Sequence, residues 1–227
     1  MGANEIGGGE MKIERFFSGD FVLESERLLF RVIVKEDAAD FYAYAKDPEV
    51  SRYLLWSPHP SLRYTERCIE NTVSLYREGL FFDFALIDKE SGRMIGTAGM
   101  TRIDAENRVG EVGYVLSREF WHRGLATEAL AVILSFAFHE LSLHRVEARF
   151  LAGNTASLRV MEKNGMTFEG YWRDALLVKG AYRTVGVCAM LEEEYKERFG
   201  AIRTPIRSAT ERDYPKHKRK GFFSLFV

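Results

Sequence analysis

Cysteine is scarce in this sequence. Its two cysteines, Cys68 and Cys188, lie far apart, and neither belongs to a C-x-x-C pair. This scarcity excludes a disulfide framework, argues against a zinc site and is typical of a reducing compartment. The histidines offer no metal set either, because His122, His139 and His144 lack an accompanying carboxylate pattern. We therefore expect no bound metal.

Long apolar runs and net charge are also missing. No stretch approaches the roughly 18 apolar residues that a membrane-spanning helix needs. The opening MGANEIGGGE has no apolar signal region. The 32 Lys and Arg residues balance 33 Asp and Glu residues, which leaves a formal net charge of -1. Such a chain has no overall electrostatic attraction to nucleic acid or to a membrane. We predict a cytoplasmic protein.

The sequence does contain enough apolar residues for one full core. Its 227 residues are 46% hydrophobic, which suits a single globular domain. We predict a flexible lead-in over 1–21, a domain over 22–199 and a tail over 200–227. Between 201 and 227 there are seven Lys or Arg residues against two acids, and the chain ends in FFSLFV. The tail is interpreted either as solvated chain or as an arm that contacts rRNA or anionic lipid.

Hydrophobic periodicity predicts alternating runs of strands and helices. Helices are expected after Asp37, from Pro48, from Ser61 to a stop at Gly79, over 124–141 and over 155–164. Strands are expected at 27–34, 81–88, 94–103, 109–116, 144–152, 166–178 and 182–191. Short turns favour antiparallel pairs, whereas the long crossover helix lets 144–152 lie parallel to 109–116. The fold class is therefore α+β, with a mixed, mostly antiparallel sheet.

A bend with small residues precedes the helix expected over 124–141. The stretch EFWHRGLATEAL places Gly124 and Ala126 where the first helical turn has unpaired N–H groups. Those groups and the helix dipole favour a phosphate or pyrophosphate. The alternative is an ordinary turn between a strand and a helix. The two common phosphate loops, GxGxxG and GxxxxGK[ST], are absent from the sequence.

The wider context of this bend resembles a known family. GEVGYVLSREFWHRGLATEAL is followed by NTASLRVMEKNGMTFEG. Together they resemble the GNAT superfamily of acetyl-CoA-dependent N-acetyltransferases, and more narrowly its RimJ/RimL-like branch, which acetylates ribosomal-protein N-termini. The resemblance extends from about residue 25 to about 198. The family's loop pattern R/Q-x-x-G-x-G/A reads Trp121 to Ala126 here, and Asn154, Ser157, Glu162, Lys163 and Gly165 match its second motif.

The resemblance implies a fold and a cofactor site. It implies helices on both faces of the sheet and a splay between the strands at 109–116 and 144–152. The pantetheine of acetyl-CoA is expected in that splay, against backbone groups of one strand. The loop backbone is expected to hold the pyrophosphate. The implied cofactor-binding residues are Tyr114, Val115, Leu116, His122, Arg123, Gly124, Leu125, Ala126, Thr127, Asn154 and Lys163.

Two residues are candidates for the chemistry of acetyl transfer. Glu111 is the candidate base, which would take a proton from the attacking amine through one or two waters. Its alternative role is that of a surface carboxylate. Ser157 is the candidate donor of a proton to the leaving thiolate, and its alternative is a hydrogen bond at the start of a helix. A covalent route through a cysteine is the less favoured mechanism.

The expected function is acetyl transfer from acetyl-CoA to a primary amine by direct attack in a ternary complex. The expected acceptor is the N-terminal α-amine of a protein such as a ribosomal protein, and the enzyme is expected to be a monomer or homodimer. One departure affects the acceptor side, because Thr184 replaces the Asp of the family's Gly-x-Tyr-x-Asp hairpin. A small-molecule amine is the alternative acceptor, and a non-catalytic acyl-CoA-binding module is the alternative of another class.

Overall fold

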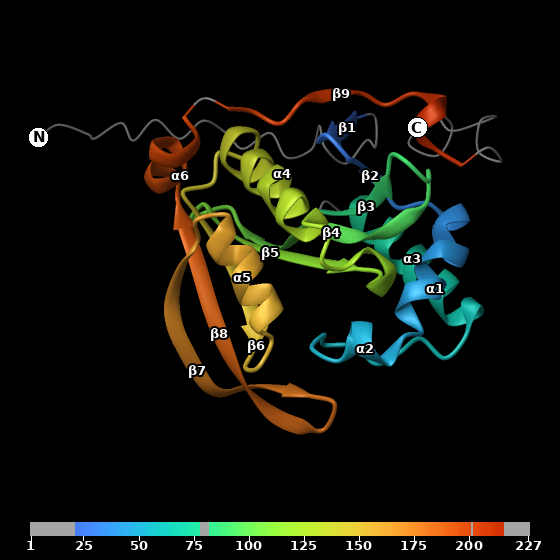
Figure 1. The fold of residues 1–227 in the computed structure, drawn as a ribbon, viewed down its shortest axis with the longest axis horizontal. Coiled ribbons are helices and arrows are strands. Elements are labelled where there is room, and N and C mark those ends of the chain that lie inside the picture. The colour runs from blue at the N-terminus through green and yellow to red at the C-terminus, as the bar shows by residue number, and fades with distance from the viewer. Residues whose placement is uncertain (1–20, 78–81, 201, 216–227) are drawn as a thin grey trace, which may run out of the picture.

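The structure is a computed structural model that describes residues 21–77, 82–200 and 202–215. Its described residues form one sheet with the strand order β7-β8-β6-β5-β4-β3-β2-β1-β9 (Figure 1). The strands are β1 (Phe21–Glu24), β2 (Leu28–Val32), β3 (Phe82–Asp88), β4 (Met94–Asp104), β5 (Val109–Leu116), β6 (Arg145–Leu151), β7 (Thr167–Val178), β8 (Ala181–Leu191) and β9 (Ile206–Ser208). β5 and β6 are parallel, and the other neighbouring strands are antiparallel. The predicted fold class is confirmed.

The helices cover both faces of this sheet. They are α1 (Ala38–Ala45), α2 (Pro48–Ser51), α3 (Leu62–Arg77), α4 (Leu125–His139), α5 (Thr155–Lys163) and α6 (Glu192–Phe199). Phe84 and Leu86 of β3 share a buried cluster with α4 and α5, whereas Ala85 and Ile87 pack with α1 and α3. Because alternate strand residues point to opposite faces, the two helix pairs lie on opposite sides of the sheet. Figure 1 shows α4 and α5 in front of it.

A buried ion pair connects strand β2 to the start of helix α1. The Arg31 guanidinium on β2 donates two hydrogen bonds to the Asp37 carboxylate, at 2.7 and 2.6 Å. Asp37 also accepts from the backbone N–H of Val34 (2.8 Å). Both charged side chains are 3% exposed. Removing one partner would leave an unpaired buried charge, which is costly. Because Arg31 lies on β2 and Asp37 directly precedes α1, the pair keeps these two elements together.

The N-terminal strand expected at 27–34 is a hairpin in the structure. β1 precedes β2 and pairs with it, and the turn between them holds Ser25. β1 is only four residues long, which is too short for its alternation to be recognised in the sequence. Of the lead-in predicted over 1–21, residues 1–20 lie outside the described residues, and its last position, Phe21, begins β1.

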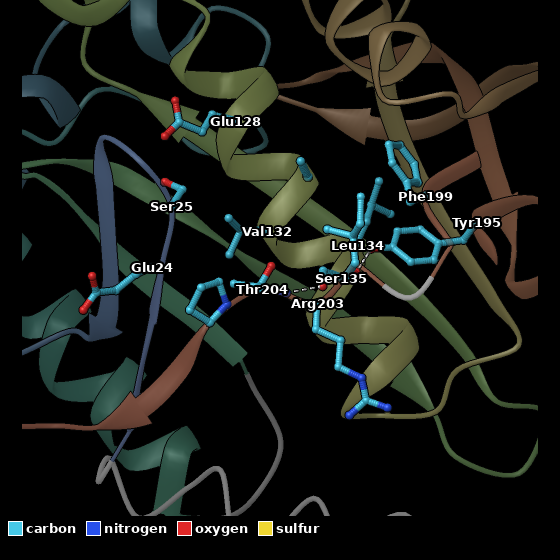
Figure 2. Close-up of a pocket in the computed structure, with 13 residues that line it drawn as sticks. Glu24, Ser25, Glu128, Val132, Leu134, Ser135, Tyr195, Phe199, Arg203 and Thr204 are labelled. Carbon is cyan, nitrogen blue, oxygen red and sulfur yellow. Dashed lines mark hydrogen bonds between the residues drawn. The ribbon is translucent and has the colours of Figure 1, made fainter. Parts of the chain in front are cut away.

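Part of the tail expected over 200–227 belongs to the sheet. β9 pairs with β1, and Arg207 binds the Asp213 carboxylate at 2.8 and 2.6 Å. The Thr204 N–H donates to Ser135 Oγ on α4 (2.8 Å), and a cavity of about 260 Å³ lies between α4, α6 and this segment (Figure 2). None of the predicted site residues lines that cavity. Residues 216–227, with the FFSLFV end, lie outside the described residues, as does the helix stop expected at Gly79.

Within residues 21–77, 82–200 and 202–215, none of the helices has the length and apolar character to cross a membrane. Within the same ranges, no three His, Cys, Asp or Glu side chains are grouped so as to hold a metal ion.

Candidate functional site

The two central strands separate partway along their length. β5 and β6 pair from Val109–Arg145 to Val112–Ala148, and this pairing goes no further within the described strands. β5 nevertheless continues to Leu116, where it is paired with β4 on its other side. The backbone of 113–116 therefore has one strand neighbour instead of two, as an inserted chain would require. The predicted splay is confirmed.

The loop between β5 and α4 turns its backbone sharply. A 3-10 turn (Arg118–Phe120) leads into Trp121, whose indole N–H donates to the Leu116 carbonyl oxygen (2.9 Å). His122 has φ of 60° and Gly124 has φ of 77°, so two residues out of three are left-handed. Such alternation turns successive N–H groups into a concave anion site. A non-glycine residue with positive φ is uncommon, which makes the loop a candidate functional element.

Helix α4 begins directly after this loop. Gly124 is its N-cap and makes no side-chain cap, and Leu125, Ala126 and Thr127 form the first turn. Their N–H groups have no partner within the helix, and the helix dipole adds partial positive charge there. The structure thus brings all six predicted loop residues, 122–127, to one place. Whether they hold pyrophosphate stays a prediction.

Tyr114 connects the splayed strand to helix α5. Its hydroxyl lies 2.9 Å from Ser157 Oγ and donates to the Ser157 carbonyl oxygen (3.1 Å). Burial raises the pKa of Tyr114 well above its usual value, so the phenol stays protonated at neutral pH. Asn154 caps α5, because its Oδ1 accepts from the Ser157 N–H (3.2 Å). Lys163 is the last residue of the same helix, and its carbonyl oxygen accepts a hydrogen bond from Arg198 Nη2 (3.4 Å).

Glu111 lies on the other face of β5. Val112 packs on the α4 side, so Glu111, Gly113 and Val115 point toward the face that α1 and α3 cover. Glu111 is directly opposite Glu147 of β6, one position before the last β5–β6 pair. The predicted base and the predicted thiolate partner are thus on opposite sides of the sheet, next to the same opening.

Arg149 and Arg102 each contact both carboxylates, those of Glu111 and Glu147. Arg149 Nε lies 3.5 Å from Glu111 Oε2, and Arg102 Nε lies 3.8 Å from the same oxygen. Each arginine also contacts Glu147, at 3.4 and 3.7 Å. Burial raises the pKa of Glu111 and exceeds the lowering by the two arginines, while Glu147 adds to the rise. A carboxylate with a raised pKa is a stronger base, which suits the predicted role.

Asp83 is a titratable residue that the sequence analysis did not single out. In the sheet register it lies opposite Gly99, which lies opposite Gly113, so the three share the face of Glu111. Burial raises the pKa of Asp83 to about 7, although hydrogen bonds from the Thr97 side chain and the Phe84 backbone act against it. One signal was available in the sequence, since FFDFALID contains a charged residue within an apolar strand.

The cysteines fit the direct route better than a covalent one. Cys188 is buried in β8, where burial raises the pKa of its thiol to about 11. Burial also raises the pKa of Cys68 on α3. The thiolate is the reactive form of cysteine, and both environments disfavour it.

The hairpin of β7 and β8 carries exposed aromatic side chains, and one of them lies against Arg149, which contacts Glu111. Trp172 is 48% exposed and stacks on the Arg149 guanidinium, while Tyr182 is 69% exposed. Lys179 Nζ at the hairpin tip donates to the Ser51 carbonyl oxygen (2.6 Å), which joins the hairpin to α2. Thr184 Oγ1 accepts from the Asp174 N–H (3.4 Å), so it serves the hairpin itself.

Comparison with known proteins identifies this arrangement. The model of the acetyltransferase (GNAT) domain matches residues 27–167. The chain belongs to the GNAT family. N-acetyltransferase p20 of Bacillus licheniformis is 35% identical over 173 residues, which are 76% of this chain and 97% of that protein. This GNAT chain is also 26% identical to the [Ribosomal protein uS5]-alanine N-acetyltransferase of Escherichia coli, across 71% of this chain and 86% of that enzyme.

Solved GNAT structures share the fold. An acetyltransferase (GNAT family) from Bacillus anthracis has a TM-score of 0.69 and 27% identity, across 76% of this chain and 99% of that one. RimL, the ribosomal L7/L12 α-N-protein acetyltransferase solved with coenzyme A, has the same TM-score at 20% identity, across 76% and 99% of the two chains. The resemblance stated from the sequence is confirmed, and the chain is an acetyl-CoA-dependent N-acetyltransferase.

Proposed function

We propose that this GNAT enzyme acetylates the α-amine at a protein N-terminus, in the manner of the ribosomal-protein acetyltransferases. The observation that carries the proposal is the similarity to the uS5-alanine enzyme, which extends over 86% of that protein. The exposed aromatic hairpin beside Glu111 supports it, because aromatic side chains such as Trp172 and Tyr182 offer contact area to a peptide. A ribosomal protein is the proposed partner, and the cytoplasm the proposed compartment.

The site residues divide the reaction between the two faces of the sheet. Acetyl-CoA supplies the acetyl thioester. The backbone of 122–127 binds its pyrophosphate, the β5 backbone at Tyr114, Val115 and Leu116 aligns its pantetheine, and Asn154 and Lys163 give further contacts. Each of these assignments is part of the proposal, supported by the loop conformation and the end of the β5–β6 pairing.

Proton transfer accompanies the change of bonds at the carbonyl carbon. The amine nitrogen forms the new C–N bond, and the C–S bond breaks. An α-amine has a pKa near 8, so at neutral pH it must lose a proton, which Glu111 accepts through water. On the other face, the paired hydroxyls of Tyr114 and Ser157 donate a proton to the leaving sulfur. The nitrogen releases its second proton as the amide forms, and that proton passes through water to restore the hydroxyl pair, while Glu111 gives its own proton to solvent. This is direct transfer in a ternary complex.

A small-molecule amine is the second candidate acceptor, and Thr184 is the observation that favours it. A carboxylate at this hairpin position would attract a cationic peptide terminus, whereas Thr184 carries no charge and already accepts a hydrogen bond. A monomer or homodimer is the proposed oligomeric state. The proposed contact with rRNA or anionic lipid involves the basic tail over 200–227, of which residues 216–227 lie outside the described residues.

An acceptor screen tests the proposal. The full chain is incubated with acetyl-CoA and peptides that begin with Ala, Ser or Met, and separately with spermidine, glucosamine and free lysine. CoA release gives the rate, and mass spectrometry locates the acetyl group. Acetylation of a peptide α-amine at a kcat/KM at least about tenfold above the small amines supports the proposal. Preference for any small amine overturns it in favour of the second candidate.

A further inference from the structure

One side chain from the β1–β2 turn reaches the predicted pyrophosphate loop. Arg27 Nη1 donates to the Arg123 carbonyl oxygen inside the loop (2.9 Å), and its Nε donates to Glu128 Oε2 (2.7 Å). Nη2 lies 2.6 Å from that carboxylate oxygen, and the backbone N–H of Arg27 donates to Oε1 (2.9 Å). One residue, about a hundred positions earlier in the chain, therefore holds both ends of the segment 123–128.

The negative charge of Glu128 lies close to the predicted phosphate site, and the contact with Arg27 offsets that charge. Its carboxylate lies in the first turn of α4, where it suits the helix dipole but repels a phosphate. Burial acts to raise the pKa of Glu128, but hydrogen bonds from the Arg27 backbone and from the Ser25 and Arg27 side chains outweigh it and lower the pKa. The carboxylate is therefore ionised at neutral pH. In Figure 2 it points away from the helix, on the side of Ser25, and Arg27 neutralises it there.

The loop backbone also needs an external support. His122 is left-handed without being glycine, a conformation that persists where the surroundings determine it. Gly124 has no side chain of its own to anchor the loop, and Arg27 Nη2 is the nearest atom, at 3.6 Å, to the position a Cβ on Gly124 would take. The Arg27 guanidinium therefore lies against the loop and donates a hydrogen bond to its Arg123 carbonyl oxygen.

We propose that Arg27 is a positioning residue for acetyl-CoA binding. It fixes the backbone of 122–127 in its anion-binding conformation and cancels the charge of Glu128. Its effect is confined to the part of the donor that carries the pyrophosphate. This role of Arg27 rests on the proposed pyrophosphate site of 122–127, and it is the same whichever amine is the acceptor.

The test compares two donors on the full chain. Acetyl-CoA affinity is measured by calorimetry, and the affinity of S-acetylpantetheine, which lacks the pyrophosphate, is measured by chemical-shift titration. The variants are Arg27→Gln, which loses the charge, and Arg27→Lys, which keeps it. Lys89→Gln is the matched control, because Lys89 Nζ binds Glu24 (2.8 Å) and the Ser25 carbonyl oxygen (2.7 Å) of the same turn without contacting the loop.

The expected result is a selective loss. Arg27→Gln weakens acetyl-CoA binding at least about tenfold, Arg27→Lys weakens it less, and Lys89→Gln leaves it unchanged. S-acetylpantetheine binds the wild-type chain and all variants equally. Unchanged acetyl-CoA affinity in Arg27→Gln overturns the proposal, as does an equal loss for both donors, which would mean a general structural role. Arg27→Lys gives the same comparison if Arg27→Gln does not fold.

Discussion

The Tyr114 hydroxyl and the Ser157 hydroxyl lie 2.9 Å apart, and they connect β5 to α5 beside the point where β5 and β6 separate. Neither group is a strong acid alone. As a hydrogen-bonded pair they can relay a proton to the leaving thiolate, because one hydroxyl can be replenished by the other. The relationship makes Tyr114 a candidate for chemistry, in addition to the contact with acetyl-CoA that the resemblance implied for it.

Removing this pair should slow turnover without weakening donor binding. Tyr114→Phe and Ser157→Ala are each expected to lower kcat about 100-fold, the lower end of the range for general acid catalysis. The double variant should lose little more, since the two hydroxyls act together. Steady-state kinetics at saturating acetyl-CoA measures the effect. A change in melting temperature with an unaltered kcat would assign both hydroxyls to structure alone.

Glu111→Gln should alter the dependence of rate on pH. A base works only when deprotonated, so the wild-type rate should fall as the pH drops through the pKa of Glu111. Burial places that pKa above its usual value. The glutamine variant should be slower and should lack this acid limb, while acetyl-CoA affinity stays the same. Wild-type rates across the whole pH range would exclude Glu111 as the base.

Gly124→Glu should weaken acetyl-CoA binding at least about tenfold, which corresponds to about 1.4 kcal/mol. The substitution places a negative charge at the start of α4 and strains a residue whose φ is 77°. Gly92→Glu is the matched control, because Gly92 has φ of 68°, an open surrounding, and lies in the turn between β3 and β4. Calorimetry on both folded variants separates charge at the loop from backbone strain. Equal affinity in both variants would make the loop a simple turn.

Asp83→Asn should change how stability depends on pH. A carboxyl whose pKa is about 7 in the folded chain and 3.8 ordinarily holds its proton more tightly when folded. Its contribution therefore favours folding at low pH and is lost as the pH rises from about 4 through about 7. The asparagine variant should be the more stable at pH 8, by at most about 4 kcal/mol at about 1.4 kcal/mol per pKa unit. Urea denaturation at pH 5 and pH 8 measures the free energy of unfolding of both chains. If the change in this free energy between pH 5 and pH 8 is the same for the variant and the wild type, the prediction is contradicted.

Truncation should distinguish two parts of the C-terminal segment. Ending the chain after Gly200 removes β9 and the hydrogen bond from Thr204 to Ser135, so the melting temperature should fall by several degrees for about 1–2 kcal/mol lost. Ending it after Pro215 leaves these contacts and should leave melting and acetyl-CoA affinity unchanged. If the basic end binds ribosomes or anionic vesicles, only the full chain should co-sediment with them, and less so as salt rises from about 50 to 200 mM. Equal sedimentation of full and shortened chains would contradict that contact.

The sequence by itself determined most of the longer elements and the loop between β5 and α4. Helix α4 occupies Leu125–His139 where periodicity predicted 124–141, and β6 occupies Arg145–Leu151 where 144–152 was expected. Gly124 is the N-cap with positive φ, at the bend the small residues indicated. These features depend on side-chain period, turn residues and caps, which act over a few neighbouring positions and can therefore be read locally.

The tertiary structure alone decided which side chains meet. The register of β3, β4 and β5 puts Asp83 on the same face as Glu111, and the β1–β2 hairpin brings Arg27 to Glu128 across 101 positions. The pairing of β9 with β1 could not be predicted either, because β9 has only three residues. A shift of one residue in any strand pair would move these groups to the opposite face. Register follows from packing of the whole sheet against its helices, so no local pattern in the chain contains it.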